Sequence, residues 1–262
     1  MSSSAQDIEF LRQNAASIQK MGESKQLCQV TLDWINLAAK YRYTYLFSAL
    51  GRPIIQFPQD MVAVAELIWR VRPDLVIETG IAHGGSLIHS ASMLALLDLC
   101  DSIKAGEKLD PSISKRKVLG IDIEIRAHNR VAIEAHPMAS RIHIIQGSSI
   151  APETIESVRE FTSNYSRVLV CLDSNHTHDH VLAELKAYAP LTSEDSYCIV
   201  FDTIVDDMPK EMFPNRPWGP DNNPKTAVHE YLKTHPEFEI DRSIQHKLMI
   251  TVAPDGYLKR IA

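Results

Sequence analysis

The segment Leu75–Ser86 constrains the fold more than any other stretch of the sequence. It reads Leu-Val-Ile-Glu-Thr-Gly-Ile-Ala-His-Gly-Gly-Ser, which is an apolar run, an acid, and then a turn of small residues. Residues 87–94 follow with apolar side chains at helical spacing. A strand, a glycine turn and a helix in this order are typical of the first unit of a nucleotide-type α/β fold.

Four later apolar runs predict further strands of the same sheet. These runs are 118–122, 142–146, 168–173 and 197–202, and helical patterns at 127–137, 151–161 and 178–189 separate them. Apolar and polar residues alternate little within these runs, which indicates a mostly parallel sheet covered on both faces. Residues 238–242 and 248–252 predict two short strands with no helix between them, and therefore a C-terminal antiparallel hairpin.

The first 60 residues predict a different organisation from the rest. Residues 7–18 and 30–45 have helical periodicity, and two prolines punctuate an extended loop at 50–60. We therefore divide the chain into an N-terminal helical extension with a loop expected on the substrate side, residues 1–60, and an α/β domain, residues 61–262. Amphipathic helices of this kind can pair subunits, so we expect a homo-oligomer.

Composition narrows the class of protein. The 262 residues carry a net charge of −6, which argues against nonspecific nucleic-acid binding. No apolar run approaches the roughly 18 residues that span a membrane. The N-terminus lacks the basic start and apolar centre of a signal peptide. Four widely spaced cysteines, two of them inside strand-like runs, are typical of free thiols in a reducing cytoplasm.

Acidic residues end most of the predicted parallel strands. Glu78, Asp122, Asp173 and Asp202 close four of the five runs, and Gln146 closes the other. The carboxyl ends of parallel strands meet at one edge of a sheet, where ligands of such folds bind. The sequence therefore predicts the active site at this edge.

The glycine turn discriminates between nucleoside ligands. Dinucleotide sites use Gly-x-Gly-x-x-Gly, because the second glycine lets the backbone approach the pyrophosphate. Here Ala82 stands two residues after Gly80, and its β-carbon lies where a pyrophosphate would press. The turn therefore favours a ligand without phosphates there, such as S-adenosylmethionine. Asp122 suits the ribose hydroxyls of either kind of ligand.

The segment after the strand at 168–173 offers a metal site and a base. Asp173 and Asp202 end neighbouring strands, so their carboxylates can hold one hard cation such as Mg²⁺. His176, three residues past Asp173, can act as general base. His178 and His180 follow at once, but a three-histidine zinc site needs non-helical geometry, because alternate residues do not share a helix face.

With these features the chain resembles the S-adenosylmethionine-dependent methyltransferases related to cephalosporin hydroxylase and rhamnosyl O-methyltransferase. The likeness runs from about residue 50 to residue 260. The segments that carry it are 51–60, 73–80, 84–86, 120–123, 172–174, 201–203, 219–220, 238–242 and 256–260. The resemblance implies a Rossmann-like class I methyltransferase fold, with a seven-stranded, mostly parallel sheet whose last two strands form an antiparallel hairpin.

The resemblance also implies residue roles. Glu78, Gly80 and Ser86 would line the methionine end of the cofactor, Asp122 would hold the ribose, and Gly147 and Ser148 would border the adenine. Asp173 would be a metal ligand, and His176 stands where catechol-type O-methyltransferases have their base.

One position departs from the family. Where its members commonly have Glu-Asp-Thr, this chain has Phe201-Asp202-Thr203, so one of two acidic metal ligands is missing. Asp206 and Asp207 are candidate substitutes from the next loop.

We therefore expect methyl transfer from S-adenosylmethionine to a hydroxyl of a small molecule or sugar moiety, assisted by Mg²⁺, with His176 as base. Candidate walls for the acceptor are residues 41–47, 51–59 and 206–223. Two alternatives stay open, a metal-dependent hydroxylase on the same fold and a cofactor-binding subunit without catalysis.

Overall fold

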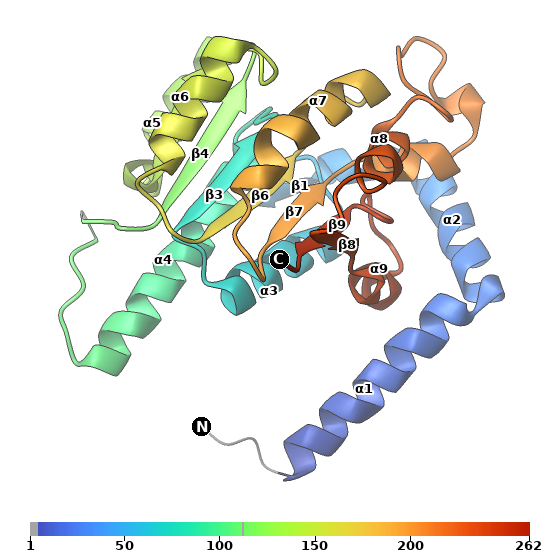
Figure 1. Ribbon diagram of the computed structural model, residues 1–262, viewed down its shortest axis with the longest axis horizontal. Helices are drawn as coiled ribbons and strands as arrows, with labels where there is room; N and C mark the ends of the chain where they lie inside the picture. The colour runs from blue at the N-terminus through green and yellow to red at the C-terminus, as the bar shows by residue number, and fades with distance from the viewer. Residues whose placement is uncertain (1–4, 112) are drawn as a thin grey trace.

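Seven strands form the central sheet of the computed structural model, which describes residues 5–111 and 113–262 (Figure 1). Their order across the sheet is β5-β4-β3-β6-β7-β9-β8. The strands are β3 (Leu75–Thr79), β4 (Lys117–Asp122), β5 (Ile142–Gln146), β6 (Val168–Leu172), β7 (Tyr197–Val200), β8 (Phe238–Ile240) and β9 (Tyr257–Arg260). The first four residues of the predicted N-terminal extension lie outside the described part of the chain.

The pairing of the strands agrees with the predicted mostly parallel sheet. The five strands from β5 to β7 are parallel, whereas β9 pairs antiparallel with both β7 and β8. The strand order reverses at β3, which has β4 on one side and β6 on the other. Ligands of doubly wound sheets bind beyond the strand ends at such a reversal.

Helices cover both faces of this sheet. They are α3 (Pro58–Val71), α4 (Gly85–Ala105), α5 (Ala127–Glu134), α6 (Pro152–Thr162), α7 (His178–Tyr188), α8 (Pro224–Tyr231) and α9 (Arg242–Leu248). Short 3₁₀ segments are η1 (Tyr43–Leu46), η2 (Ala139–Arg141), η3 (Ala189–Leu191), η4 (Thr203–Asp207) and η5 (Lys210–Met212).

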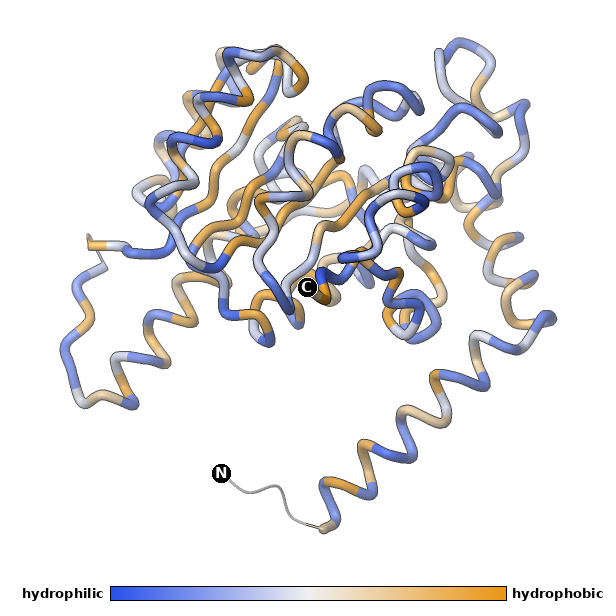
Figure 2. The backbone as a smooth tube through the Cα atoms, in the orientation of Figure 1, coloured by the Kyte–Doolittle hydropathy of each residue, from blue (hydrophilic) through white to orange (hydrophobic). Residues whose placement is uncertain are grey.

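Two buried clusters form the core, one on each face. Val76 points into the cluster with α3, α4 and α9, and its neighbour Ile77 points into the cluster with α6, α7 and α8. Successive side chains of a strand face opposite sides of a sheet, so continuous apolar strands need cover on both. Figure 2 shows these strands as apolar segments inside more polar ones.

The N-terminal extension consists of two helices and a small hairpin. Helix α1 (Ala5–Glu23) has no buried residue. Its N-terminal end extends away from the body of the molecule (Figure 1), whereas its C-terminal end packs against α9, where Gly22 adjoins the His246 ring. Helix α2 (Lys25–Ala39) buries only Ile35. The segment predicted as an extended loop contains one strand of an antiparallel hairpin, made by β1 (Phe47–Ala49) and β2 (Arg52–Ile54).

The predicted C-terminal hairpin is right in its antiparallel pairing and wrong in its second strand. β8 pairs with residues 257–260, and helix α9 lies between the two strands. Asp241 caps α9 by accepting a hydrogen bond from the Ser243 amide, 3.2 Å away. The apolar stretch 248–252 forms no strand, because the Val252 amide donates to the Asp60 carboxylate (2.9 Å) instead of to a neighbouring strand.

Helix α4 differs from the expectation that no segment is apolar enough to span a membrane. Among the described helices it is the one whose length and mean hydropathy (1.3) would allow a span. Its side chains Leu87, Leu94 and Leu97 are fully buried in the core against the sheet. A core helix behaves in this way, so the hydropathy is weak evidence for a span.

Candidate active site

The turn after β3 is shaped by protein contacts. Gly80 and Gly84 have φ of +80° and +82°, which favour glycine. A β-carbon on Gly80 would lie 2.1 Å from the Asp173 carbonyl oxygen, and one on Gly85 would lie 2.2 Å from the Pro53 carbonyl oxygen. The absence of a side chain at Gly80 and Gly85 therefore lets neighbouring backbone approach closely. That backbone comes from the loop after β6 at Gly80 and from the N-terminal hairpin at Gly85.

Glu78 and Ser86 face each other on one side of this turn. Glu78 is 4% exposed, and the Ser86 hydroxyl donates a hydrogen bond to its carboxylate. Both residues line a small cavity of about 30 Å³ together with Asp173. Burial, with a smaller contribution from the Asp122 charge, raises the pKa of Glu78 to about 7, although the Ser86 hydrogen bond opposes the change.

Asp122 lies on the other side of the turn. Its Oδ2 accepts hydrogen bonds from the Ile81 amide (3.0 Å) and the Ala82 amide (3.4 Å). Asp122 and Ala82 line a second cavity, of about 510 Å³, with Asn129 and Tyr45. The glycine turn thus stands between two cavities, each with a carboxylate at its edge.

Gly147 and Ser148 follow the neighbouring strand β5. The Gly147 amide donates to the Asp122 carbonyl oxygen at 2.9 Å, which brings this loop beside the end of β4. A β-carbon on Gly147 would lie 2.5 Å from Thr154 Oγ1. Among the described residues neither Gly147 nor Ser148 lines the 510 Å³ cavity.

Asp173, His176 and Asp202 come together at the ends of β6 and β7. One ligand atom from each lies within 4.8 Å of the others, and His176 Nε2 is 3.2 Å from Asp202 Oδ2. The parallel register sets Leu172 against Val200, so both strands release their chains at the same edge. Asp202 lies just beyond β7 with φ of +56°.

The electrostatics of this cluster favour a cation. The pKa of Asp173 is raised well above its usual value, first by burial and then by the Asp202 and Glu78 charges. Two carboxylates that repel each other are stabilised when a positive ion lies between them. The His176 ring packs edge-on against Trp218, with ring centroids 4.9 Å apart, so the segment after η5 covers one side of the cluster.

Residues 41–261 match the family model of rhamnosyl O-methyltransferase/CmcI. The chain belongs to this family. It is therefore an S-adenosylmethionine-dependent methyltransferase, as expected from the sequence.

Relatives and solved structures agree with this family. A rhamnosyl O-methyltransferase of Mycobacterium tuberculosis is 29% identical over 206 residues, which cover 77% of this chain and 73% of the relative. Its counterpart in Mycobacterium leprae is 27% identical over 213 residues, with 80% and 82% covered. The structure of CmcI with Mg and SAM is similar in fold, with a TM-score of 0.54 and 19% identity over 83% of this chain and 78% of CmcI.

Phe201, which stands where the family commonly has an acid, belongs to the core. It is 6% exposed and lines the 30 Å³ cavity beside Asp60, Glu78 and Asp173. An acid here would add a fourth carboxyl group to that cavity. The methyltransferase thus presents Asp173 and Asp202, with His176, as its cluster of candidate ligands in the described chain.

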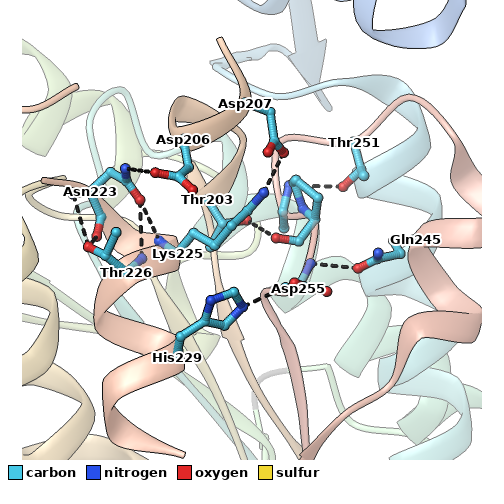
Figure 3. A network of polar contacts seen from close by, with 12 residues as sticks. Thr203, Asp206, Asp207, Asn223, Lys225, Thr226, His229, Gln245, Thr251 and Asp255 are labelled. Carbon is cyan, nitrogen blue, oxygen red and sulfur yellow. Dashed lines mark hydrogen bonds and ion pairs between the residues drawn. The ribbon is translucent and has the colours of Figure 1, made fainter. Parts of the chain in front are cut away.

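Asp206 and Asp207 have polar partners outside this cluster, in α8 and at its cap (Figure 3). Asp206 Oδ1 accepts from Asn223 Nδ2 at 2.7 Å, and Asp207 forms an ion pair with Lys225. They brace the segment between η4 and α8. The structure therefore does not bring them into the place of the missing acidic ligand.

The neighbouring histidines also have other partners. His178 Nδ1 is 2.8 Å from Thr226 Oγ1, and His180 Nε2 is 3.0 Å from Ser149 Oγ. Helix α7 begins at His178, so the three histidines diverge and form no three-histidine metal site within the described residues.

Two buried residues of the site lie in segment 51–60, which was named from the sequence as a whole, without either residue being singled out. Asp60 is fully buried, and it accepts hydrogen bonds from Tyr257 Oη (2.7 Å) and the Val252 amide. Burial, opposed by these bonds, raises the pKa of Asp60 to about 6. Gln56 lines the same cavity. The segment that contains both residues was named for its family resemblance, and neither residue was given a role.

Proposed function

We propose that this methyltransferase transfers the methyl group of S-adenosylmethionine to a hydroxyl of a sugar-containing small molecule. The observation that carries the proposal is the Asp173–His176–Asp202 cluster at the strand ends, in contact with the glycine turn through Gly80. Family membership favours methyl transfer over the hydroxylase and non-catalytic alternatives. The rhamnosyl O-methyltransferases among the relatives support a sugar as the methyl acceptor.

The cofactor would lie across the glycine turn. Glu78, Gly80 and Ser86 form the methionine end, where the buried carboxyl groups of Asp60 and Glu78 suit a cationic ligand. Asp122 holds the ribose at the edge of the larger cavity. Gly147 and Ser148 border the adenine. The separation of the two cavities by the turn supports this assignment.

Asp173 and Asp202 would hold Mg²⁺. Carboxylate oxygens are the protein ligands that Mg²⁺ prefers, and water commonly completes its six-coordinate shell. The spacing of the ligand atoms and the raised pKa of Asp173 both fit a bound cation. A bound Mg²⁺ would lower the pKa of the acceptor hydroxyl and orient it. The family commonly has a third acid at the position of Phe201, beside the equivalents of Asp173 and Asp202. We therefore expect this protein to bind the metal more weakly than a site with all three acids.

His176 would remove the proton of the acceptor hydroxyl. If its Nε2–H donates to Asp202 Oδ2, the lone pair that takes the proton lies on Nδ1. The acceptor oxygen forms a bond to the methyl carbon while the carbon–sulfur bond breaks, and the electron pair of that bond goes to sulfur. The three reacting atoms must lie in line, so positioning contributes much of the rate.

The acceptor would enter over the segment that carries Trp218. This segment, residues 206–223, lies against His176 through the Trp218 ring. The Asp206–Asn223 and Asp207–Lys225 contacts hold both of its ends (Figure 3). A braced segment against the base fits a wall of the acceptor site, and a planar aromatic ring there suits a sugar.

A radiolabelled methyl-transfer assay tests the proposal. The purified protein is incubated with methyl-labelled S-adenosylmethionine, MgCl₂ and a panel of rhamnosides and other glycosides. We expect label in at least one glycoside, and less after treatment with a chelator. Binding of S-adenosylmethionine without label in any hydroxyl acceptor would contradict O-methyl transfer, and label unaffected by chelator would contradict the metal assignment.

A further inference from the structure

Gln56 is a buried amide with an unused acceptor. It lies between β2 and α3, is 7% exposed, and is held in place by its own backbone amide, which donates to the Thr44 carbonyl oxygen at 3.1 Å. Its side-chain Oε1 has no hydrogen-bond partner among the described residues. A buried acceptor without a donor destabilises a fold, so such a group in a functional site calls for an explanation.

The surroundings of Gln56 define the ligand that would satisfy it. It lines the 30 Å³ cavity that also contains Glu78, Ser86 and Asp173. The Ser86 hydroxyl already donates to Glu78. Asp60 also lines the cavity, so three carboxyl groups and the amide oxygen make it rich in acceptors, and its size suits a group of a few atoms. A small cationic donor is complementary to it.

We propose that Gln56 binds the cofactor, with its amide oxygen accepting a hydrogen bond from the α-ammonium group of the methionine moiety. This inference rests on the proposed function, in which the methionine end lies at Glu78 and Ser86. The sulfonium at that end carries no N–H group, whereas the ammonium carries three. The ammonium is therefore the cofactor group that can satisfy an amide oxygen here.

Isothermal titration calorimetry on Gln56→Met tests the inference. Methionine preserves the length of the side chain and removes the acceptor. We expect the variant to bind S-adenosylmethionine and S-adenosylhomocysteine roughly tenfold to a hundredfold more weakly, as for one lost hydrogen bond to a charged group. 5′-Methylthioadenosine lacks the amino-acid moiety, so its affinity should be unchanged.

The matched control is Gln59→Met. Gln59 Oε1 is also buried without a partner among the described residues, but this residue does not line the cavity. The Gln59→Met variant should bind S-adenosylmethionine, S-adenosylhomocysteine and 5′-methylthioadenosine as tightly as the parent protein does. Thermal unfolding without ligand should show both variants at least as stable as the parent protein, because each loses an unsatisfied buried acceptor.

The outcomes separate the two proposals. Equal affinity of Gln56→Met and the parent protein for S-adenosylmethionine would overturn the role of Gln56 and assign its oxygen to a water molecule. Weaker binding of 5′-methylthioadenosine to the same degree would also overturn it, because the loss would then be general. A parent protein that binds neither nucleoside would overturn the proposed function itself.

Discussion

At the scale of single residues, the site depends on pairs of groups that neighbouring strands bring together. Asp173 stands one residue past β6 and Asp202 two residues past β7, and His176 reaches back to Asp202 from the intervening loop. Their chemistry is complementary, because the carboxylates suit a hard cation and the imidazole suits a proton. Each group can therefore be tested separately.

Replacement of His176 by alanine should abolish most turnover and leave cofactor binding intact. A general base contributes about 10²–10⁴-fold to a rate, so we expect a loss in kcat of at least about 100-fold. Steady-state kinetics with calorimetry of S-adenosylmethionine binding checks both parts. His128→Ala, which removes an exposed histidine on α5, serves as control. Near-parental turnover of His176→Ala would exclude His176 as base.

Replacement of Asp202 by asparagine should lower the apparent affinity for Mg²⁺. The change removes one of two carboxylate ligands and leaves the side-chain shape unchanged. We expect the MgCl₂ concentration needed for half-maximal activity to rise about tenfold or more. Titration of activity against MgCl₂ measures this, with Asp206→Asn, an acid braced by Asn223, as control. Identical titration curves for Asp202→Asn and the parent protein would exclude Asp202 as a ligand.

The raised pKa of Glu78 predicts how stability without ligand depends on pH. The folded pKa is about 7 and the ordinary value is 4.5, so folding favours the protonated form. The stability contributed by Glu78 is full below about pH 4.5 and is lost as pH rises through about 7. We expect the free energy of unfolding to fall between pH 5 and 8 by on the order of 1–3 kcal/mol from this group.

Denaturant unfolding of Glu78→Gln at both pH values checks this prediction. Glutamine accepts the same hydrogen bond from Ser86 but does not titrate. Asp60 and Asp173, which line the same cavity with His89, retain their own pH dependence in both proteins. The fall should therefore be smaller in the variant, and an equal fall would show that Glu78 does not titrate as described.

At the scale of elements, the N-terminal hairpin holds the glycine turn. Arg52 of β2 donates from Nη2 to the His83 carbonyl oxygen (2.7 Å) and to Asn129 Oδ1 (3.0 Å). Asn129 Nδ2 in turn donates to the Ala82 carbonyl oxygen at 3.1 Å. Ala82 has φ of +43°, a conformation that L-residues adopt rarely. The hairpin and α5 thus stabilise a turn that is strained at Ala82.

Replacement of Arg52 by methionine should therefore weaken cofactor binding from outside the cofactor site. Loss of hydrogen bonds from a charged group leaves the strained turn less ordered, and we expect about tenfold weaker binding of S-adenosylmethionine. Calorimetry measures the affinity, and Arg159→Met on the exposed face of α6 controls for the loss of charge. If both variants bind like the parent protein, the hairpin does not order the turn.

At the scale of the whole molecule, the catalytic body and the first helix are distinct. Helix α1 has no buried residue, and the family model begins only at residue 41. Exposed apolar side chains along α1 include Ile8, Phe10 and Leu11. Pairing of subunits through the N-terminal helices stays a prediction, which light scattering of the full chain checks.

Removal of residues 1–23 should leave the catalytic body folded. The deleted helix has no buried residue and contacts the catalytic body through α9, and the stability of a helix in a protein comes mostly from packing of its apolar face. We expect cooperative thermal unfolding. Because distant sites act nearly independently, the affinity for S-adenosylmethionine should stay within about threefold of that of the parent protein. Circular dichroism and calorimetry measure these. Loss of cooperative unfolding would show that α1 is part of the core unit.

The sequence by itself determined the five parallel strands of the sheet and the acids at the ends of four of them. Apolar runs such as 168–172 are local signals. Parallel pairing places the carboxyl ends of these strands at one edge of the sheet, independently of the length and conformation of the loops. Asp173, His176 and Asp202 could be grouped for this reason. Ala82 in the glycine turn favoured S-adenosylmethionine as cofactor, and the family resemblance implied the same cofactor.

Only the tertiary structure decided which neighbours these residues have. Gln56 joins Glu78 in one cavity, Gly85 adjoins Pro53, and Asp206 turns toward Asn223, although each pair is at least 17 residues apart. Helix α9 was missed because it is short and its cap at Asp241 lies inside the segment 238–242, which predicted a strand. Periodicity reports the local backbone, whereas contacts between distant segments depend on packing that no short window of sequence contains.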